Sequence, residues 1–216
     1  GSATPAPVEL PGGLTLAQAL RNHRIIRITL AIFILSIAGA AVTVFLVPMV
    51  TKAGITRSEA AIIASLFGVT AFAGKLIAGW LMDRFTTTLI PFGAFVLPAL
   101  GYFLVWQYPG SFTALTMAAL VNGLGGGASL PVSTYLVTRY AGVRHFGKIF
   151  GIVSSLLGLA GGLGPQLAAY VFDTTGSYAV LMLVCMCLVL VAALSVLALG
   201  PYPKFEPVQP DESLPG

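Results

Sequence analysis

The sequence predicts an all-α membrane protein with six transmembrane helices. Of its 216 residues, 57% are hydrophobic and only 8% are charged, and the mean hydropathy is +0.94. A soluble domain has about 25% charged residues, so this chain has too little polar surface to face water on every side. Its apolar runs lack the alternation of polar and apolar residues that is typical of a membrane β-barrel.

Six apolar runs reach or approach the roughly 20 residues that a helix needs to cross a membrane. In chain order they are Ile25–Val50, Ala60–Met82, Leu89–Trp106, Phe112–Val137, Ile149–Phe172 and Tyr178–Leu199. The loops between them are short, which makes successive helices antiparallel and predicts one six-helix domain over residues 21–200. The proline-rich, polar flanks, residues 1–20 and 201–216, are expected to be flexible.

Lysine and arginine are distributed unequally between the two ends of these helices. If the helices alternate in direction, one side carries Arg21, Arg24, Arg27, Arg84, Arg139, Arg144, Lys148 and Lys204. The other side carries only Lys52 and Arg57. Because positive residues favour the cytoplasmic side, we expect a multi-pass cell-membrane protein with both termini in the cytoplasm. This topology explains the net charge of +4, and no nucleic-acid partner is expected.

No group of residues in the sequence suggests catalysis, a cofactor or a metal. Cys185 and Cys187 are two positions apart, which puts them on different faces of a helix and excludes a shared disulfide or metal site. The glycine-rich run 123–127 lies inside an apolar segment with no strand before it, unlike a phosphate-binding loop. We therefore expect neither an enzyme nor a bound cofactor.

Pairs of glycines recur four positions apart in the fourth and fifth runs. The pairs are Gly123 and Gly127, Gly147 and Gly151, and Gly158 and Gly162. Such pairs let helix backbones approach closely in a membrane, so packing is the first interpretation. Flexible points for gating are the alternative, and the Gly164-Pro165 pair, which can kink a helix, is consistent with it.

The second run ends in Gly79-Trp80-Leu81-Met82-Asp83-Arg84, which resembles the Gly-x-Leu-x-Asp-Arg loop motif of the major facilitator superfamily. Other stretches support the resemblance in register. The segment 14–21 resembles the central loop before a seventh helix, and segments 146–151, 164–165 and 172–178 are similar to an eleventh helix and its following turn. The resemblance covers Leu14–Leu199 and is closest to the oxalate/formate antiporter and monocarboxylate porter branch.

This resemblance implies that the chain forms the C-terminal six helices of a twelve-helix secondary transporter, one half of a major facilitator fold. The implied activity is movement of a small organic anion by alternating access. The implied partners are that anion, membrane lipids and a second six-helix half, either another copy of the chain or an N-terminal half. Asp83, Arg84 and Gly79 would then be gating residues, although they could simply end the helix at the membrane edge.

Lys75 is the one charged residue far from the ends of an apolar run. It lies about 12 Å inward from Asp83 at 1.5 Å per residue, in a hydrocarbon core ~30 Å thick. An intramembrane lysine usually faces the bundle interior or a water-filled cavity, although its long side chain could instead reach back to the headgroups. No carboxylate of the chain lies at its depth, so a substrate anion is its expected partner. Small residues share its helix face, which is expected to pack inward: Gly68, Ala71, Ala78 and Gly79.

The family supports an anion site at this position. In the branch named above, the residue after the glycine that matches Gly74 is typically an arginine that binds the substrate carboxylate. Lys75 offers a point charge without the planar two-pronged contact of arginine. Ala71 stands where proton-coupled animal porters carry an aspartate, so coupling through that pair is absent here. A single positive charge fits a monoanion better than a dianion.

By analogy with the family, the first and fourth helices of each half line the central cavity. Ser36, Thr43, Asn122 and Ser129 are therefore expected to bind substrate together with Lys75, although interhelical packing is an equally open role for them. Asn122 and Ser129 belong to a stripe that continues through Gly126 and Ser133. Two other functions remain open: a non-transporting membrane assembly partner on the same scaffold, and a transporter of a neutral or cationic solute.

Overall fold

The computed structural model describes residues 12–52, 54–203 and 205. Its helices are α1 (Leu16–Arg21), α2 (His23–Lys52), α3 (Arg57–Arg84), α4 (Leu89–Gln107), α5 (Phe112–Ala141), α6 (Phe146–Thr175) and α7 (Tyr178–Leu197). Among the described residues the only β-type pairing is an isolated bridge between Gly13 and Gly142. The all-α prediction is confirmed.

Six of these helices, α2 to α7, are long and apolar enough to cross a membrane. The shortest is α4, with 19 residues, and it corresponds to the shortest predicted run. Large apolar side chains stay exposed on the outside of the bundle; Val69 is 66% exposed and Val191 57%. Such a surface suits lipid, and the chain is a multi-pass membrane protein as predicted.

The helix ends follow local sequence rules. α3 begins at a capping box, in which the Thr56 hydroxyl accepts from the Glu59 N–H at 3.3 Å and the Glu59 carboxylate accepts from the Thr56 N–H at 3.0 Å. Gly142, with a φ of 75°, follows the last residue of α5, and Gly176, with a φ of 67°, follows the last residue of α6. Glycine adopts this left-handed conformation without strain, so both helices stop where the sequence permits a turn.

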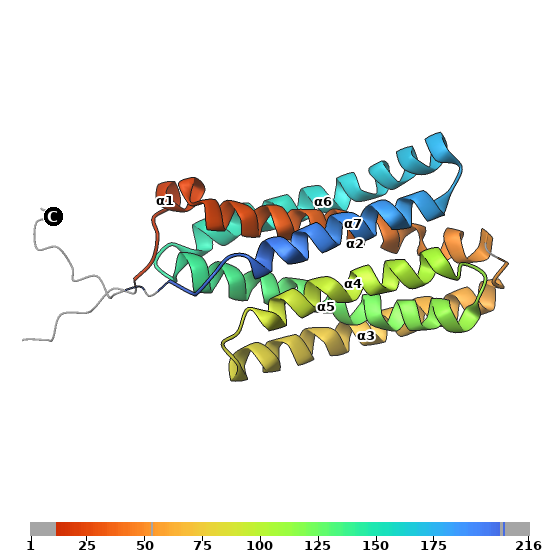
Figure 1. Ribbon diagram of the computed structural model, residues 1–216, viewed down its shortest axis with the longest axis horizontal. Coiled ribbons are helices and arrows are strands. Elements are labelled where there is room, and N and C mark those ends of the chain that lie inside the picture. Colours follow the sequence, from red (N-terminus) through yellow and green to blue (C-terminus); the bar gives the residue numbers. More distant parts are fainter. Residues whose placement is uncertain (1–11, 53, 204, 206–216) are drawn as a thin grey trace, which may run out of the picture.

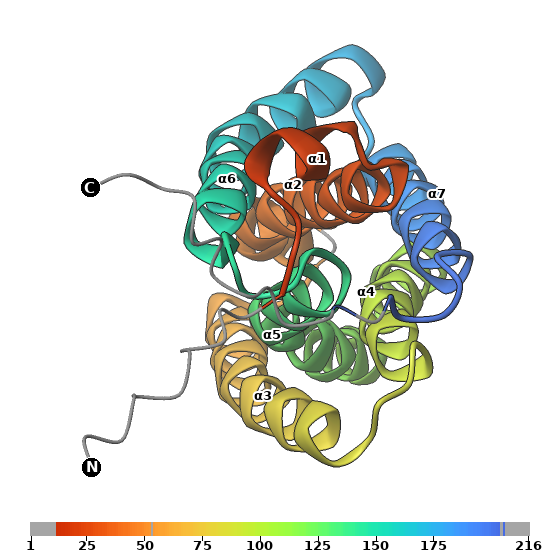
Figure 2. The ribbon, with the colours of Figure 1, turned by 90° about the vertical axis from the view of Figure 1, so that its left-hand side faces the viewer.

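The long helices form two layers (Figures 1 and 2). In one layer α5 packs against α3 on one side and α4 on the other. In the second layer α2 packs against α6 and α7. Contacts of α4 with α7 and of α2 with α5 join the layers. The polar residues of the predicted site lie on α2, α3 and α5, so both layers contribute to it.

Glycine makes the contact between α3 and α5 unusually close. A β-carbon added to Gly127 would overlap the backbone of Ala71, and one added to Gly74 would overlap the backbone of Leu124. The packing interpretation is therefore confirmed for the pair Gly123 and Gly127. Among the described residues it is wrong for the other pairs, because an added β-carbon meets nothing within 4 Å at Gly147, Gly151, Gly158 or Gly162.

The N-terminal flank contains a helix that the sequence analysis did not expect. Residues 1–11 lie outside the described part, but α1 forms because Thr15 and Gln18 build a capping box. Its Ala19 is 1% exposed, and the N–H of Leu14 donates to the Ala141 carbonyl at 2.8 Å. A capped, docked turn has replaced the flexible segment predicted over residues 16–20.

Both ends of the six-helix domain lie at the same end of the bundle. The Arg27 guanidinium, near the start of α2, donates to the carbonyls of Ser195 at 3.0 Å and Ala198 at 3.3 Å at the end of α7. The Tyr140 hydroxyl donates to the Gly200 carbonyl at 2.7 Å. Lys204 and residues 206–216 of the predicted tail lie outside the described residues.

Because successive long helices are antiparallel, the cations of the described chain separate as the sequence predicts. We call one end the basic end; it carries Arg21, Arg24, Arg27, Arg84, Arg139, Arg144 and Lys148. Lys52 and Arg57 lie at the opposite end, where the Lys52 ammonium sits 4.3 Å above the ring of Phe172.

Candidate functional site

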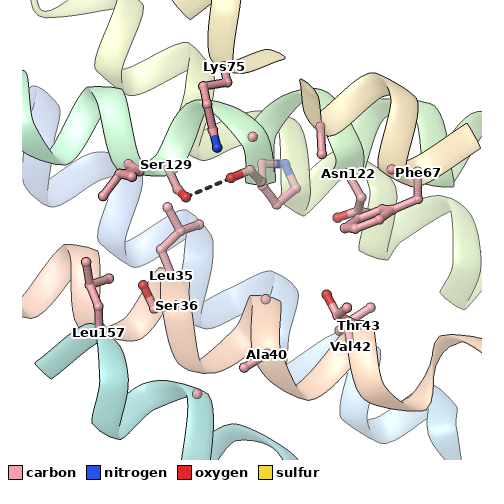
Figure 3. A pocket seen from close by; sticks show the side chains of 18 of the residues that line it. Leu35, Ser36, Ala40, Val42, Thr43, Phe67, Lys75, Asn122, Ser129 and Leu157 are labelled. Carbon is pink, nitrogen blue, oxygen red and sulfur yellow. Dashed lines mark hydrogen bonds between the residues drawn. The ribbon is translucent and has the colours of Figure 1, made fainter. Parts of the chain in front are cut away.

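A cavity of about 620 Å³ lies between the two layers. α2, α3 and α5 supply most of its lining, α4 adds Pro98 and Tyr102, and α6 adds Leu157 and Gly161. The structure brings together all five residues that the sequence analysis selected for substrate binding: Ser36, Thr43, Lys75, Asn122 and Ser129. Figure 3 shows them around this space, which we call the central cavity.

Lys75 carries the only charge in the described lining of the central cavity. Its side chain is exposed and points from α3 into the cavity, toward Ser129 on α5 (Figure 3). The described lining contains no aspartate or glutamate. The ammonium therefore brings three hydrogen-bond donors and one positive charge to a space bounded largely by apolar groups.

The packing of α3 explains the direction of Lys75. Gly74 and Ala78 are buried, and Gly74 lies against the backbone of α5. Lys75 is the next residue after Gly74, about 100° further around the helix, so its side chain points past that contact and into the cavity. Of the small residues predicted on its own face, Gly68 and Ala71 line the central cavity, whereas a β-carbon added to Gly79 would meet no described residue within 4 Å.

Asn122 is a buried polar residue of the cavity, at 8% exposed. Its side-chain amide donates to the Ala118 carbonyl one turn earlier, at 3.0 Å. On α4, Gly101 leaves the room that this amide occupies, since a β-carbon there would overlap it. The position of the Asn122 amide is thus set by its own helix and by a glycine of a neighbouring helix.

The two serines use their hydroxyl protons within their own helices. Ser36 donates to the Ile32 carbonyl and Ser129 to the Gly126 carbonyl, each at 2.7 Å. In this arrangement they present acceptor oxygens to the cavity, and a bound carboxylate would require the hydroxyls to rotate. Ser133, the last residue of the predicted stripe, is 1% exposed and does not line the cavity.

The predicted gating residues lie at the end of α3. Asp83 and Arg84 are exposed, and the helix stops where the N–H of Phe85 donates to the Leu81 carbonyl at 2.9 Å. Gly79 is half-buried, and a β-carbon added to it would meet no described residue within 4 Å. Both charged side chains are thus free to meet a partner at the basic end.

Sequence reasoning missed the contribution of α4 to the site. Tyr102 is only 2% exposed yet lines the cavity, and Gly101 shapes the position of Asn122. In the sequence, the only hint of this contribution was the presence of Gly101 and Tyr102 within the apolar run Leu89–Trp106. Within the described residues, no group of three or more histidine, cysteine, aspartate or glutamate side chains is placed to hold a metal ion.

The family model described as the Major Facilitator Superfamily matches residues 28–214 of the chain. Monocarboxylate transporter 12 of Rattus norvegicus is 27% identical over 146 residues, covering 66% of this chain and 30% of the relative. The class D tetracycline resistance protein of Salmonella ordonez is 28% identical over 113 residues, covering 52% of this chain and 28% of the relative. The chain thus spans about a third of the length of these relatives.

Among solved structures, the fold is similar to the crystal structure of the POT family transporter PepTSo. The TM-score is 0.70 at 16% identity, and the match covers 88% of this chain and 39% of the other. At this sequence identity the similarity supports a shared fold and nothing further. It confirms the prediction of six helices that form one half of a larger transporter fold.

Proposed function

Because the chain belongs to the Major Facilitator Superfamily, we propose that it is one half of a secondary transporter that moves a small organic monoanion by alternating access. The observation that carries the proposal is the Lys75 ammonium, directed into a cavity whose described lining contains no acid. The substrate carboxylate supplies the missing negative charge.

The electrostatics favour an anion at this point. A lysine at the centre of a membrane helix costs about 2.5–3.5 kcal/mol on insertion scales, and pairing offsets that cost. Two unit charges 4 Å apart attract by about 4 kcal/mol at an effective dielectric constant of 20. One ammonium neutralises one carboxylate, whereas a dianion would keep a net negative charge unless the second half supplied another cation.

The remaining lining suits the carbon part of such a substrate. Apolar walls come from Leu35, Phe72 and Leu157, and the amide of Asn122 and the hydroxyls of the serines offer polar contacts. Thr43 lies with Ser36 on α2, across the cavity from Lys75 (Figure 3). The relative named monocarboxylate transporter 12 agrees with this chemistry.

The proposal includes a second six-helix half. The chain spans 30% of the length of the rat relative, and on α6 no described residue packs against the glycines at 147, 151, 158 and 162. A second half, either another copy or an N-terminal half, would cover this face and close the central cavity. Asp83, Arg84 and Gly79 would then meet its helix ends, with both termini of this chain in the cytoplasm of a cell-membrane protein.

A neutral or cationic solute is the second candidate. Most of the described lining is apolar, including Phe67, Leu130 and Leu157, and one relative is named a tetracycline resistance protein. In that case Lys75 would be structural. The third possibility, a non-transporting assembly partner, predicts no ligand at all.

The deciding experiment compares three ligands of similar size on the purified protein: propionate, its isosteric amide propionamide, and propylamine. Thermal unfolding and calorimetry should report stabilisation and binding with the carboxylate alone. Equal responses to the amide would favour the neutral-solute function, a response to the amine alone would favour a cationic solute, and no response to any carboxylate in the assembled protein would remove the proposal.

A further inference from the structure

A second cavity, of about 310 Å³, lies near the basic end between α1, α2 and α6. We call it the α1 groove, because the short helix α1 forms one of its walls; Figure 2 shows α1 beside α2 and α6. Thr29 is the only residue of its described lining with a polar side chain. Leu20 and Leu30, which line it, are each 54% exposed, so the groove presents open apolar surface.

The α1 groove is separate from the central cavity. On α2 its lining runs from Ile25 to Phe33, whereas the lining of the central cavity begins at Leu35, and the two linings share no residue. It therefore lies closer than the central cavity to the start of α2 and takes no part in the anion site described above.

The groove also points away from the face proposed for the second half. On α6 its lining residues Ile149 and Ile152 lie roughly 140° around the helix from the unpacked glycines Gly151 and Gly158. A partner that covers those glycines would leave the α1 groove open to the surrounding bilayer.

The depth of the groove matches part of one lipid leaflet. From Ile26 to Phe33 the α2 wall extends about 10 Å at 1.5 Å per residue. One leaflet contributes about 15 Å, half of a hydrocarbon core ~30 Å thick. The groove is therefore long enough to hold the upper part of an acyl chain.

Cations stand at the mouth of the groove. Arg21 directly follows the lining residue Leu20, and Lys148 lies one helical turn before the lining residue Ile152; both cations are exposed. The described acidic residues are Glu59, Asp83 and Asp173. Only Asp83 lies at the basic end, on α3, which does not line the groove. The mouth is therefore positively charged and the interior is apolar.

We propose that the α1 groove binds one anionic phospholipid, with an acyl chain in the apolar groove and the phosphate between Arg21 and Lys148. A lysine or arginine near an anionic membrane surface contributes a factor of about five in binding. The two cations together select an anionic headgroup, and the groove fixes the chain of the same molecule. This site stands whether or not the central cavity binds a carboxylate.

The test is native mass spectrometry of the purified protein, titrated with phosphatidylglycerol or with phosphatidylcholine of the same acyl chains. We expect tighter binding of phosphatidylglycerol, weakened about fivefold by Lys148→Gln and about thirty-fold when Arg21→Gln is added. Arg84→Gln is the matched control for lipid binding, since it removes one charge from the basic end away from the groove, and the affinity for phosphatidylglycerol should be unchanged.

A shape variant tests the groove without altering its charge. Ile152→Trp places a large side chain in the groove and should weaken phosphatidylglycerol binding although Arg21 and Lys148 remain. Thermal unfolding in phosphatidylcholine establishes that each variant is folded, and the tryptophan variant keeps the test decisive if the charge variants do not fold. Unchanged phosphatidylglycerol binding in folded variants, or equal binding of the two lipids by the parent protein, overturns the proposal.

Discussion

Gly127 of α5 and Ala71 of α3 are in direct backbone contact, so close that a β-carbon on Gly127 would overlap the Ala71 carbonyl. The same interface brings Gly74 against Leu124. Lys75 follows Gly74, and Ser129 lies two residues after Gly127. The glycine contact between the two helices therefore sets where the ammonium and the serine stand relative to each other.

Gly127→Ala should destabilise the protein, because the new methyl group can be accommodated only if α3 and α5 move apart. Overpacking of this kind typically costs 1–3 kcal/mol, roughly, and here it meets backbone rather than a flexible side chain. We expect a lower midpoint of thermal unfolding in detergent. Gly126→Ala is the matched control, since nothing lies within 4 Å of a β-carbon there; an equal loss in both variants would argue against the contact.

Gly101→Ala should disturb the site through Asn122. The added methyl group on α4 overlaps the Asn122 amide and must displace it from its position at the cavity wall. If Asn122 contacts the substrate, ligand affinity should fall by more than the thermal stability accounts for. Gly93→Ala, on the same helix and with no neighbour within 4 Å, is the control for helix effects. Unchanged affinity in a folded Gly101→Ala protein would show that Asn122 is a packing residue.

The sequence predicted the helices well because a membrane imposes length and apolarity on each span. The run Leu89–Trp106, for example, became α4 (Leu89–Gln107). It also identified Lys75, since a charge inside an apolar run is a local signal. Grouping Lys75 with Asn122 and Ser129 depended on the family resemblance, and the cavity brings those residues together.

Non-local contacts were beyond the reach of the sequence. Nothing near Gly101 shows that it faces Asn122, because that contact depends on how α4 and α5 pack. The pairs Gly158–Gly162 and Gly123–Gly127 share one sequence pattern, yet in the part of the chain that the structure describes only the second is packed. Spacing places residues on one helix face but does not say which neighbour covers that face.

The predicted topology can be tested by cysteine labelling. In a background without Cys185 and Cys187, single cysteines replace Lys52 and Arg144, which lie at opposite ends of the bundle. A membrane-impermeant reagent should label the first from outside and the second only after the membrane is opened, since the basic end is expected in the cytoplasm. Labelling of both from one side would contradict six antiparallel spans, and the reverse pattern would invert the orientation.

The unpacked glycine face of α6 gives a prediction about assembly. Gly158→Leu adds a large side chain where the described chain has no neighbour, so the stability of the isolated domain should change little. If a second half covers this face, the substitution should weaken assembly, measured as the mass of the detergent-solubilised complex. Leu159→Ala, at an exposed position beside it, is the control. Unaltered assembly in the Gly158 variant would place the partner elsewhere.

Lys75 is the residue on which the anion proposal depends, and its variants separate charge from structure. Lys75→Gln keeps a polar side chain of similar reach but removes the charge that would pair with a carboxylate. We expect the affinity of the assembled protein for a carboxylate to fall at least tenfold. Membrane insertion and thermal stability should persist, because the ammonium lies in an open cavity and not in a packed contact. Calorimetry with propionate measures the loss.

Lys75→Arg should retain part of the affinity, since the positive charge survives while a wider planar group replaces a compact ammonium. A bound carboxylate should also shield the Lys75 amine from acylating reagents, which gives a readout independent of affinity. Lys52, whose ammonium lies over Phe172 at the other end of the bundle, provides the internal control for labelling. If Lys75→Gln binds propionate as tightly as the parent protein does, the lysine is structural, and a neutral or cationic substrate becomes the better interpretation of the cavity.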